Sequence, residues 1–318
     1  MPPHEPALAL ALRSGVDLAH AWVQDVADGL GIRVLFIKGP TLSRQGLRAE
    51  RTSSDVDVLV EPAGFDRLCD ELQSRGWRER PAPLIGRLTS VHSRAFLHDR
   101  WPCDLDVHRH YPGMLADPGA AFDALWAERE SGEFAHRRCA VPSRVANIIV
   151  LALHSLRGTE RQARHADELA ALETIPLTPA ERTGLADMAM RTGTTVTLAE
   201  VFQRMGVAVP VDPQQNASTA AYRWRERVNS GSFGSYFWFA ALRDARGAER
   251  ARIAARAVWP SRSDLLLSRP ETVDTTVGRA AARLRRWGRG ARSLPRALRA
   301  MRARTRIDSI GSGGPPWS

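Results

Sequence analysis

Residues 35–62 read LFIKGPTLSRQGLRAERTSSDVDVLVEP, and this stretch decides the fold of the first part of the chain. Residues 32–37, IRVLFI, form a short apolar run rich in β-branched side chains, which predicts a buried strand. Residues 54–60 alternate, with valines on one side and Asp55 and Asp57 on the other. That period of two predicts a second strand with one apolar and one acidic face.

The acidic face predicts a divalent cation. Two carboxylates that project from one face repel each other unless a positive charge lies between them. Mg²⁺ binds a few carboxylate oxygens and completes its shell with water and phosphate oxygens. The later segment DLDVH offers Asp104 or Asp106 as a third carboxylate on another expected strand. Such a set could hold two ions about 4 Å apart, on the attacking and leaving oxygens of a displacement.

The turn between the two strands has the features of a phosphate site. Gly39 allows a ligand to approach the backbone closely, and Pro40 suits the first turn of a helix. The free N–H groups of such a turn favour an anion. Lys38 is the only lysine of the chain, whereas the other 44 cationic side chains are arginine. A compact ammonium beside a triphosphate would explain why this position is not arginine.

These segments resemble the DNA polymerase beta-like nucleotidyltransferase superfamily, and in particular a bacterial family of uncharacterised nucleotidyltransferases within it. The shared residues stand here as Lys38-Gly39, Leu42, Arg51, Asp55-Val56-Asp57 and Leu105-Asp106-Val107-His108. The resemblance implies a small mixed β-sheet with flanking helices, NTP as substrate and Mg²⁺ as cofactor, with Mn²⁺ as an alternative.

The resemblance also implies roles for individual residues. Asp55 and Asp57 would hold the metal, and Asp106, favoured over Asp104 by its LDVH context, would be the third catalytic and metal-binding carboxylate. The nucleotide side would consist of Lys38, Gly39, Thr41, Arg51 and Ser54. Pro40 stands where many members of the superfamily have Gly or Ser, so one backbone donor is missing and the Thr41 hydroxyl would replace it. For Arg51, a phosphate contact and a structural ion pair are both open.

Beyond Pro118 the pattern becomes helical. Helices are expected at 7–30, 63–75, 119–129, 143–157, 161–172, 179–191, 195–205 and 217–229, and further strands at 93–98 and 103–108. The predicted fold class is therefore α+β. The predicted organisation is a nucleotidyltransferase core at 1–115, an all-α domain at 116–260 and a basic tail at 261–318, with the active site between the first two.

The positive charge of the chain is concentrated near its C-terminus. The formal net charge is +10, but residues 243–306 hold 18 Arg and five acidic residues, a net of +13, which leaves −3 for the rest. Within the tail, Gly288, Gly290 and Pro295 are expected to interrupt a helical stretch, and 311–318 are expected to be disordered. The tail could be a solvated arm, a docking surface for nucleic acid or anionic lipid, or a partner-binding helix.

Several classes of protein are excluded or disfavoured. The chain has no run of 18 or more apolar residues, so no membrane span is expected. The three widely spaced cysteines suit a reducing, cytoplasmic location. The chain has no P-loop, G-x-G-x-x-G or G-x-S-x-G motif. His108 and His110 lie on one strand face, where they could bind metal, but a place at the site entrance or the strand end is the simpler interpretation.

The sequence thus predicts an enzyme that moves an NMP from an NTP to an unknown acceptor, which could be a protein, an RNA or a small molecule, and releases pyrophosphate. The alternative is a non-catalytic nucleotide-binding sensor or scaffold whose basic tail contacts nucleic acid or membrane. A toxin that modifies tRNA or protein is a third interpretation. The sequence reveals neither the acceptor nor the base preference.

Overall fold

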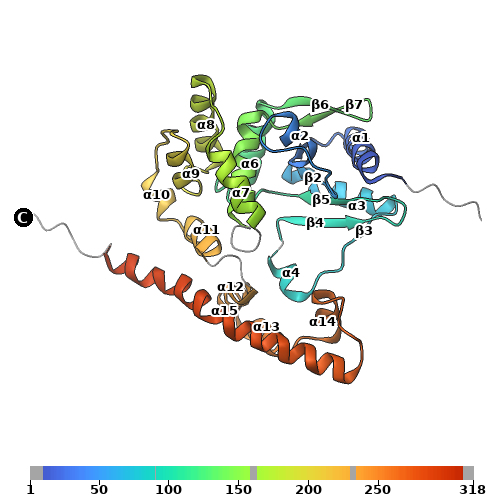
Figure 1. The fold of residues 1–318 in the computed structure, drawn as a ribbon, viewed down its shortest axis with the longest axis vertical. Coiled ribbons are helices and arrows are strands. Elements are labelled where there is room, and N and C mark those ends of the chain that lie inside the picture. Colours follow the sequence, from blue (N-terminus) through green and yellow to red (C-terminus); the bar gives the residue numbers. More distant parts are fainter. Residues whose placement is uncertain (1–9, 90, 158–162, 230–233, 311–318) are drawn as a thin grey trace, which may run out of the picture. The chain divides into compact units, whose positions relative to one another are not determined.

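The structure, a computed structural model, describes residues 10–89, 91–157, 163–229 and 234–310. The chain divides into two compact units. Unit 1 comprises residues 1–80, 92–156 and 164–221, and unit 2 comprises 81–91, 157–163 and 222–318. Figure 1 follows the elements of both along the chain.

Unit 1 contains a five-stranded mixed sheet in the order β1-β2-β5-β4-β3. The strands are β1 (Val34–Ile37), β2 (Asp55–Val60), β3 (Arg78–Glu79), β4 (Ser93–Leu97) and β5 (Asp104–His108). β2 and β5 pair in parallel, whereas the other neighbours are antiparallel. The four strands predicted from the sequence all occur, and the predicted α+β fold class with its small mixed sheet is confirmed.

The valine face of the sheet carries the core of unit 1. Val56, Val58 and Val60 are fully buried and pack in one cluster with α1 (Leu12–Leu30) and α3 (Phe65–Ser74), which follows the 3₁₀ turn η1 (Pro62–Gly64). Helix α1 ends because Gly31 adopts a left-handed φ of 65° and caps it. With both helices bound to the valine face, the acidic face of β2 is left for the site. The part of the first predicted helix before residue 10 lies outside the described residues.

A β-hairpin, β6 (Glu130–Phe134) and β7 (Arg137–Val141), corrects the all-helical expectation for 116–260. Its inward-facing Phe134, Cys139 and Val141 join the core of the sheet. The sequence did not indicate this hairpin because its turn uses Ala135 and His136 at positive φ in place of the usual Asn-Gly or Asp-Gly pair.

Helices complete unit 1. They are α2 (Gly39–Arg44), α5 (Pro118–Ala127), α6 (Arg144–Leu156), α7 (Ala163–Glu173), α8 (Pro179–Thr192), α9 (Ala199–Arg204) and α10 (Pro213–Asn216), followed by α11 (Thr219–Asn229), which runs on into unit 2. α8 begins at a capping box, in which the Thr178 side chain accepts from the Glu181 N–H and Glu181 bonds back to the cap. α5 to α9 and α11 lie close to their predicted positions, whereas α10 was not predicted.

Unit 2 is helical in the part that the structure describes. It contains α4 (Leu84–Thr89), α12 (Gly234–Asp244), α13 (Gly247–Val258), α14 (Arg262–Ser268) and α15 (Thr276–Ile310). α15 corrects the expected interruptions, because it continues through Gly288, Gly290 and Pro295. One proline removes one hydrogen bond, and a 35-residue helix that packs on α12 retains its neighbouring turns.

Three further expectations concern the ends and boundaries. Residues 311–318, expected to be disordered, lie outside the described residues. The boundaries at 115 and 260 remain predictions. Over the described ranges, no helix is long and apolar enough to cross a bilayer.

Candidate active site

The turn after β1 has a strained backbone. Lys38 and Gly39 have φ values of 61° and 54°. Glycine adopts a positive φ freely, whereas another residue held in such a region costs on the order of 1–3 kcal/mol and is typical of functional sites. Arg48 Nη2 donates a hydrogen bond to the Gly39 carbonyl at 2.7 Å. The surrounding structure therefore stabilises a conformation that lysine alone would not favour.

Strand pairing gathers four carboxylates on the face opposite the valines. β2 and β5 are in register so that Asp55 lies beside Asp104 and Asp57 beside Asp106. Because side chains of directly paired residues share a face of the sheet, all four project to the same side. The acidic face expected from alternation is thus extended across two strands.

Asp57 is the centre of a buried polar chain. Its Oδ1 lies 2.5 Å from Lys38 Nζ and 3.0 Å from His108 Nε2. His108 Nε2 also lies 3.4 Å from Asp106 Oδ2. Burial by itself raises the pKa of Asp57, but the charge of Lys38 and the hydrogen bond of His108 outweigh it and hold that pKa well below its usual range. Asp57 is therefore ionised, with a cation in contact.

The other two carboxylates have different surroundings. Burial raises the pKa of Asp55, and the charge of Asp57 raises it further, while Lys38 opposes both. Ser53 Oγ donates a hydrogen bond to Asp55 Oδ1 at 3.1 Å. Asp104 forms an ion pair with Arg80. The geometry therefore brings Asp106 to Asp57, whereas Asp104, at the start of β5, is paired with Arg80.

The residues present fit a divalent cation. One ligand atom from each of Asp57, Asp106 and His108 lies within 4.8 Å of the other two. Carboxylate oxygens suit Mg²⁺ and Mn²⁺, and an imidazole nitrogen favours Mn²⁺ over Mg²⁺. A cation bound to Asp57 would compete with the ammonium of Lys38 for the same oxygen.

A cationic cluster adjoins the acidic face. Arg51 Nη1 pairs with Glu168 Oε1 of α7 at 2.9 Å. Burial, together with the charges of Arg51 and Arg164, lowers the pKa of Arg48 to about 10, while Glu168 and Asp57 oppose the shift. Arg51 and Arg164 are therefore close enough for their charges to act on Arg48, with Glu168 of α7 as the carboxylate paired with Arg51. An anion would relieve that repulsion.

His20 packs against the turn formed by Lys38 and Gly39. Its Nδ1 donates a hydrogen bond to the Val16 carbonyl at 2.7 Å, and its ring stacks on Phe134 with centroids 4.2 Å apart. Burial lowers the pKa of His20 to about 4, so the ring is neutral. A Cβ on Gly39 would lie 3.7 Å from His20 Nε2. The ring therefore lies directly against the turn that holds Lys38.

Of the residues predicted from the sequence, Lys38, Asp57 and Asp106 come together most closely. Thr41 is buried within α2, and Ser54 is exposed just before β2. Both positions are near the site in sequence, and their nucleotide-binding roles remain predictions. For Arg51 the structure contains the ion pair, which leaves a phosphate contact as a prediction.

From the sequence, metal binding by His108 was the less favoured interpretation, and Arg48 and Arg164 had no predicted role; the structure places His108 beside Asp57 and Asp106. His108 was available from the alternation of β5, since it shares a face with Asp106. For Arg48 and Arg164 no local pattern separates them from 42 other arginines. Their proximity depends on how α7 packs, which is a tertiary feature.

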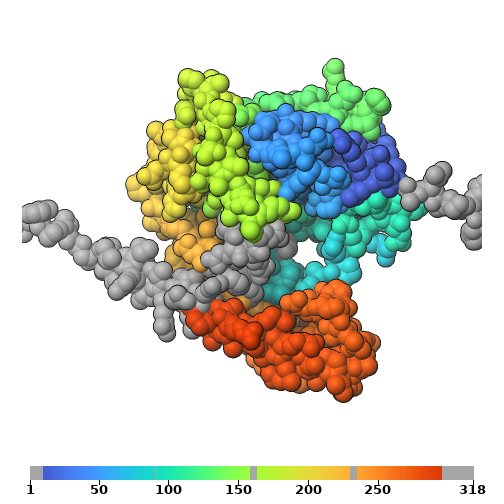
Figure 2. All heavy atoms as spheres, in the orientation of Figure 1, coloured from blue at the N-terminus to red at the C-terminus, as the bar shows by residue number. Residues whose placement is uncertain are grey.

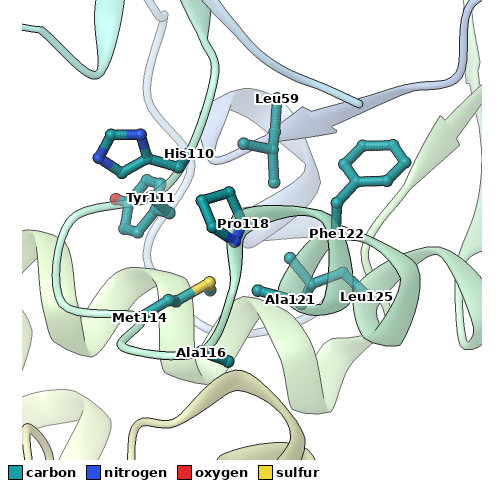
Figure 3. A pocket seen from close by; sticks show the side chains of 9 residues that line it. All are labelled: Leu59, His110, Tyr111, Met114, Ala116, Pro118, Ala121, Phe122 and Leu125. Atoms are coloured by element: carbon teal, nitrogen blue, oxygen red, sulfur yellow. The ribbon is translucent and has the colours of Figure 1, made fainter. Parts of the chain in front are cut away.

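The hollow at the far end of the acidic face is not a nucleotide pocket. Figure 3 shows it between Leu59, Tyr111, Pro118 and Phe122. Its volume is about 20 Å³, and one water needs on the order of 10–15 Å³. A nucleoside therefore has no room there, and Leu59, two residues beyond Asp57, marks the point where this face becomes core.

Comparisons with solved structures find distant likenesses. A lincosamide antibiotic adenylyltransferase bound to lincomycin is 15% identical with a TM-score of 0.34, over 50% of this chain and 96% of that one. An antigenic nucleotidyltransferase-like protein from Paracoccidioides brasiliensis is 12% identical with a TM-score of 0.36, over 62% and 94%. A tRNA-processing enzyme in its apo form is 15% identical with a TM-score of 0.26, over 82% and 78%.

Sequence comparison is more specific. No curated protein matches the chain. A family described as "Uncharacterised nucleotidyltransferase" matches residues 25–169, a range that contains the Lys38 turn, both acidic strands and α7 up to Leu169. The resemblance is therefore confirmed, and residues 25–169 match the uncharacterised nucleotidyltransferase family.

Proposed function

We propose that this chain transfers a nucleoside monophosphate from an NTP to an acceptor and releases pyrophosphate, with Mg²⁺ or Mn²⁺ as cofactor. The observation that carries the proposal is the juxtaposition of Asp57 and Asp106 on parallel strands, with Lys38 in contact with Asp57. Within a segment that matches a nucleotidyltransferase family, such a set suits charge neutralisation of a triphosphate.

The reaction balances as a single displacement. A nucleophilic oxygen of the acceptor forms a bond to the α-phosphorus, and the bond from that phosphorus to the oxygen bridging to the β-phosphorus breaks. The acceptor proton passes to Asp106, whose side chain is more exposed than that of Asp57, and pyrophosphate leaves. A divalent cation bound here would supply Lewis-acid activation and neutralise developing charge.

The cationic residues suit the leaving group. In this proposal Lys38 moves from Asp57 to a phosphate oxygen when metal and nucleotide bind together. Arg48, Arg51 and Arg164 would receive the β- and γ-phosphates, with Glu168 keeping Arg51 in position. Thr41 and Ser54 would add hydroxyl donors near the turn. Asp55 would be a second metal ligand, since a bound cation would lower its raised pKa.

The acceptor is the open part of the proposal. A protein, an RNA and a small molecule all offer a suitable nucleophile. We also propose a cytoplasmic location, in line with three free cysteines that are all buried.

The decisive experiment uses NTPs labelled on the α-phosphate. Purified protein is incubated with each labelled NTP, Mn²⁺ or Mg²⁺ and a cell extract as the acceptor source, and products are resolved by size and nuclease or protease sensitivity. Transfer of α-label that Asp57→Asn abolishes supports the proposal. Asp104→Asn serves as the matched control, because it removes a carboxylate from the same face but not from the Asp57 cluster.

The same experiment tests the alternative. A sensor or scaffold would bind nucleotide in a metal-dependent manner and transfer no label to any acceptor. Nucleotide binding is therefore measured in parallel by equilibrium dialysis. Binding without transfer over all four NTPs and the full extract contradicts the enzyme.

A further inference from the structure

Unit 2 contains a large cleft of its own. It is bounded by α4, α12, the α13–α14 segment and α15, and its volume is about 1290 Å³. Ligand pockets for small molecules are typically about 300–1,000 Å³. The surface of α14 and of the first part of α15 is the orange-to-red area of Figure 2. The cleft is thus large enough for a long ligand and lies wholly within one unit.

The floor of the cleft is apolar. α4 contributes Leu84 and Ile85, and α12 contributes Trp238, Phe239 and Leu242. None of the three α12 residues is fully buried. An apolar floor inside a cleft of this volume is typical of a ligand-binding site.

The rim of the cleft is strongly cationic. Its arginines are Arg256, Arg269, Arg286, Arg289 and Arg292. Among the residues that the structure describes, no carboxylate forms an ion pair with Arg286, Arg289 or Arg292. One lining carboxylate, Asp264, accepts hydrogen bonds from the Leu84 N–H at 2.8 Å and from Ser261 Oγ at 2.7 Å. The lining residues therefore carry four positive charges in excess.

The surroundings of the cleft point to lipid. The exposed large apolar residues between 258 and 294 are Val258, Trp259, Leu267, Val273, Val277, Leu284, Trp287 and Leu294. Four of them, Val277, Leu284, Trp287 and Leu294, lie on α15 at spacings of seven and three, and the rings of Trp259 and Trp287 lie 6.1 Å apart. Arginine, tryptophan and aliphatic side chains exposed on one helix are typical of helices that lie in the interface of an anionic membrane.

We propose that this cleft binds an anionic phospholipid at a membrane surface, with the phosphate on the arginine rim and acyl carbon on the apolar floor. A single-stranded RNA would use the arginines and the cleft tryptophans Trp238 and Trp287, because bases stack on aromatic faces. It would leave the aliphatic floor residues Leu84, Ile85 and Leu242 without a partner. The proposal does not depend on the nucleotidyltransferase site of unit 1.

The test uses the full chain and vesicles. Flotation with phosphatidylglycerol vesicles is compared with flotation with phosphatidylcholine vesicles. Arg289→Gln and Arg292→Gln should each weaken binding to phosphatidylglycerol about fivefold, the contribution of one arginine near an anionic surface. Arg285→Gln is the matched control, because Arg285 is exposed on the same helix but does not line the cleft.

The apolar floor is tested separately. Leu242→Asn should weaken vesicle binding while circular dichroism stays unchanged, and soluble dihexanoyl phosphatidylglycerol should compete, whereas glycerol phosphate should not. Equal losses for Arg285→Gln and Arg289→Gln would show a diffuse charge effect and overturn the cleft. Binding of a single-stranded RNA that Arg289→Gln weakens, without vesicle binding, would also overturn it.

Discussion

Replacing Lys38 with Met tests the electrostatics of the site in depth. The substitution keeps a long unbranched side chain but removes the ammonium that lies 2.5 Å from Asp57 Oδ1. Both side chains are largely buried, with 12% and 6% of their surfaces exposed. Breaking a buried ion pair by removing one partner costs about 3–5 kcal/mol, because a buried charge is left behind. We expect Lys38→Met to destabilise unit 1 by an amount in that range at pH 7.

The loss should depend on pH in a defined direction. The pKa of Asp57 is depressed in the folded state, so its stabilising contribution is present above the pKa of an unfolded aspartate, about 3.9, and disappears as the pH falls below it. The difference between wild type and Lys38→Met should therefore be full at pH 7 and shrink below about pH 4. Urea unfolding followed by circular dichroism at several pH values measures it.

Two further variants make the experiment specific. Lys38→Met combined with Asp57→Asn removes both charges and should regain most of the lost stability. Mn²⁺ without nucleotide should bind Lys38→Met more tightly than wild type, since no ammonium competes for the Asp57 oxygen. A Lys38→Met protein as stable as wild type, or with weaker Mn²⁺ binding, would refute the reasoning.

Three other predictions follow from the same contacts. Asp106→Asn should lower label transfer about 10²-fold or more, as expected for a group that acts on the reacting charge, whereas Asp104→Asn should keep most activity; equal losses in initial rate would contradict the assignment. Burial lowers the pKa of His20 to about 4, so between pH 6.5 and 4 the unfolded state takes up a proton that the folded state does not. Wild type should therefore lose about 3 kcal/mol of stability over that window, and His20→Gln should lose less, as measured by urea titrations. Gly39→Ala should cost about 1 kcal/mol of stability because alanine resists a φ of 54°; an unchanged urea midpoint would show that the turn can relax.

Local patterns made the core of the fold predictable. The apolar run at 32–37 and the alternation at 54–60 are properties of neighbouring residues, and both became strands of the sheet. The hairpin around Ala135 was not predictable, because a positive φ at a residue other than glycine is enforced by packing rather than by sequence. The continuity of α15 through Pro295 likewise depends on tertiary contacts with α12.

The candidate site was likewise predictable from the sequence only in part. Asp57 and Asp106 could be paired from their strands, and the same alternation places His108 beside Asp106. Arg51 was a candidate from the sequence, but its association with Arg48 and Arg164 could not be predicted, since it depends on how α7 packs near the loop before β2. Sequence patterns identify the acidic side of the site together with Lys38 and Arg51, whereas only the tertiary structure adds Arg48 and Arg164.

Label transfer from NTP tests the central claim most directly. Protein is incubated with Mn²⁺, extract and ATP, GTP, CTP or UTP labelled on either the α- or the γ-phosphate, and the labelled acceptor is isolated. We predict that α-label is transferred to an acceptor, that γ-label is recovered as pyrophosphate, and that Asp57→Asn abolishes transfer. Transfer of γ-label, or α-label transfer that survives Asp57→Asn, would contradict the account.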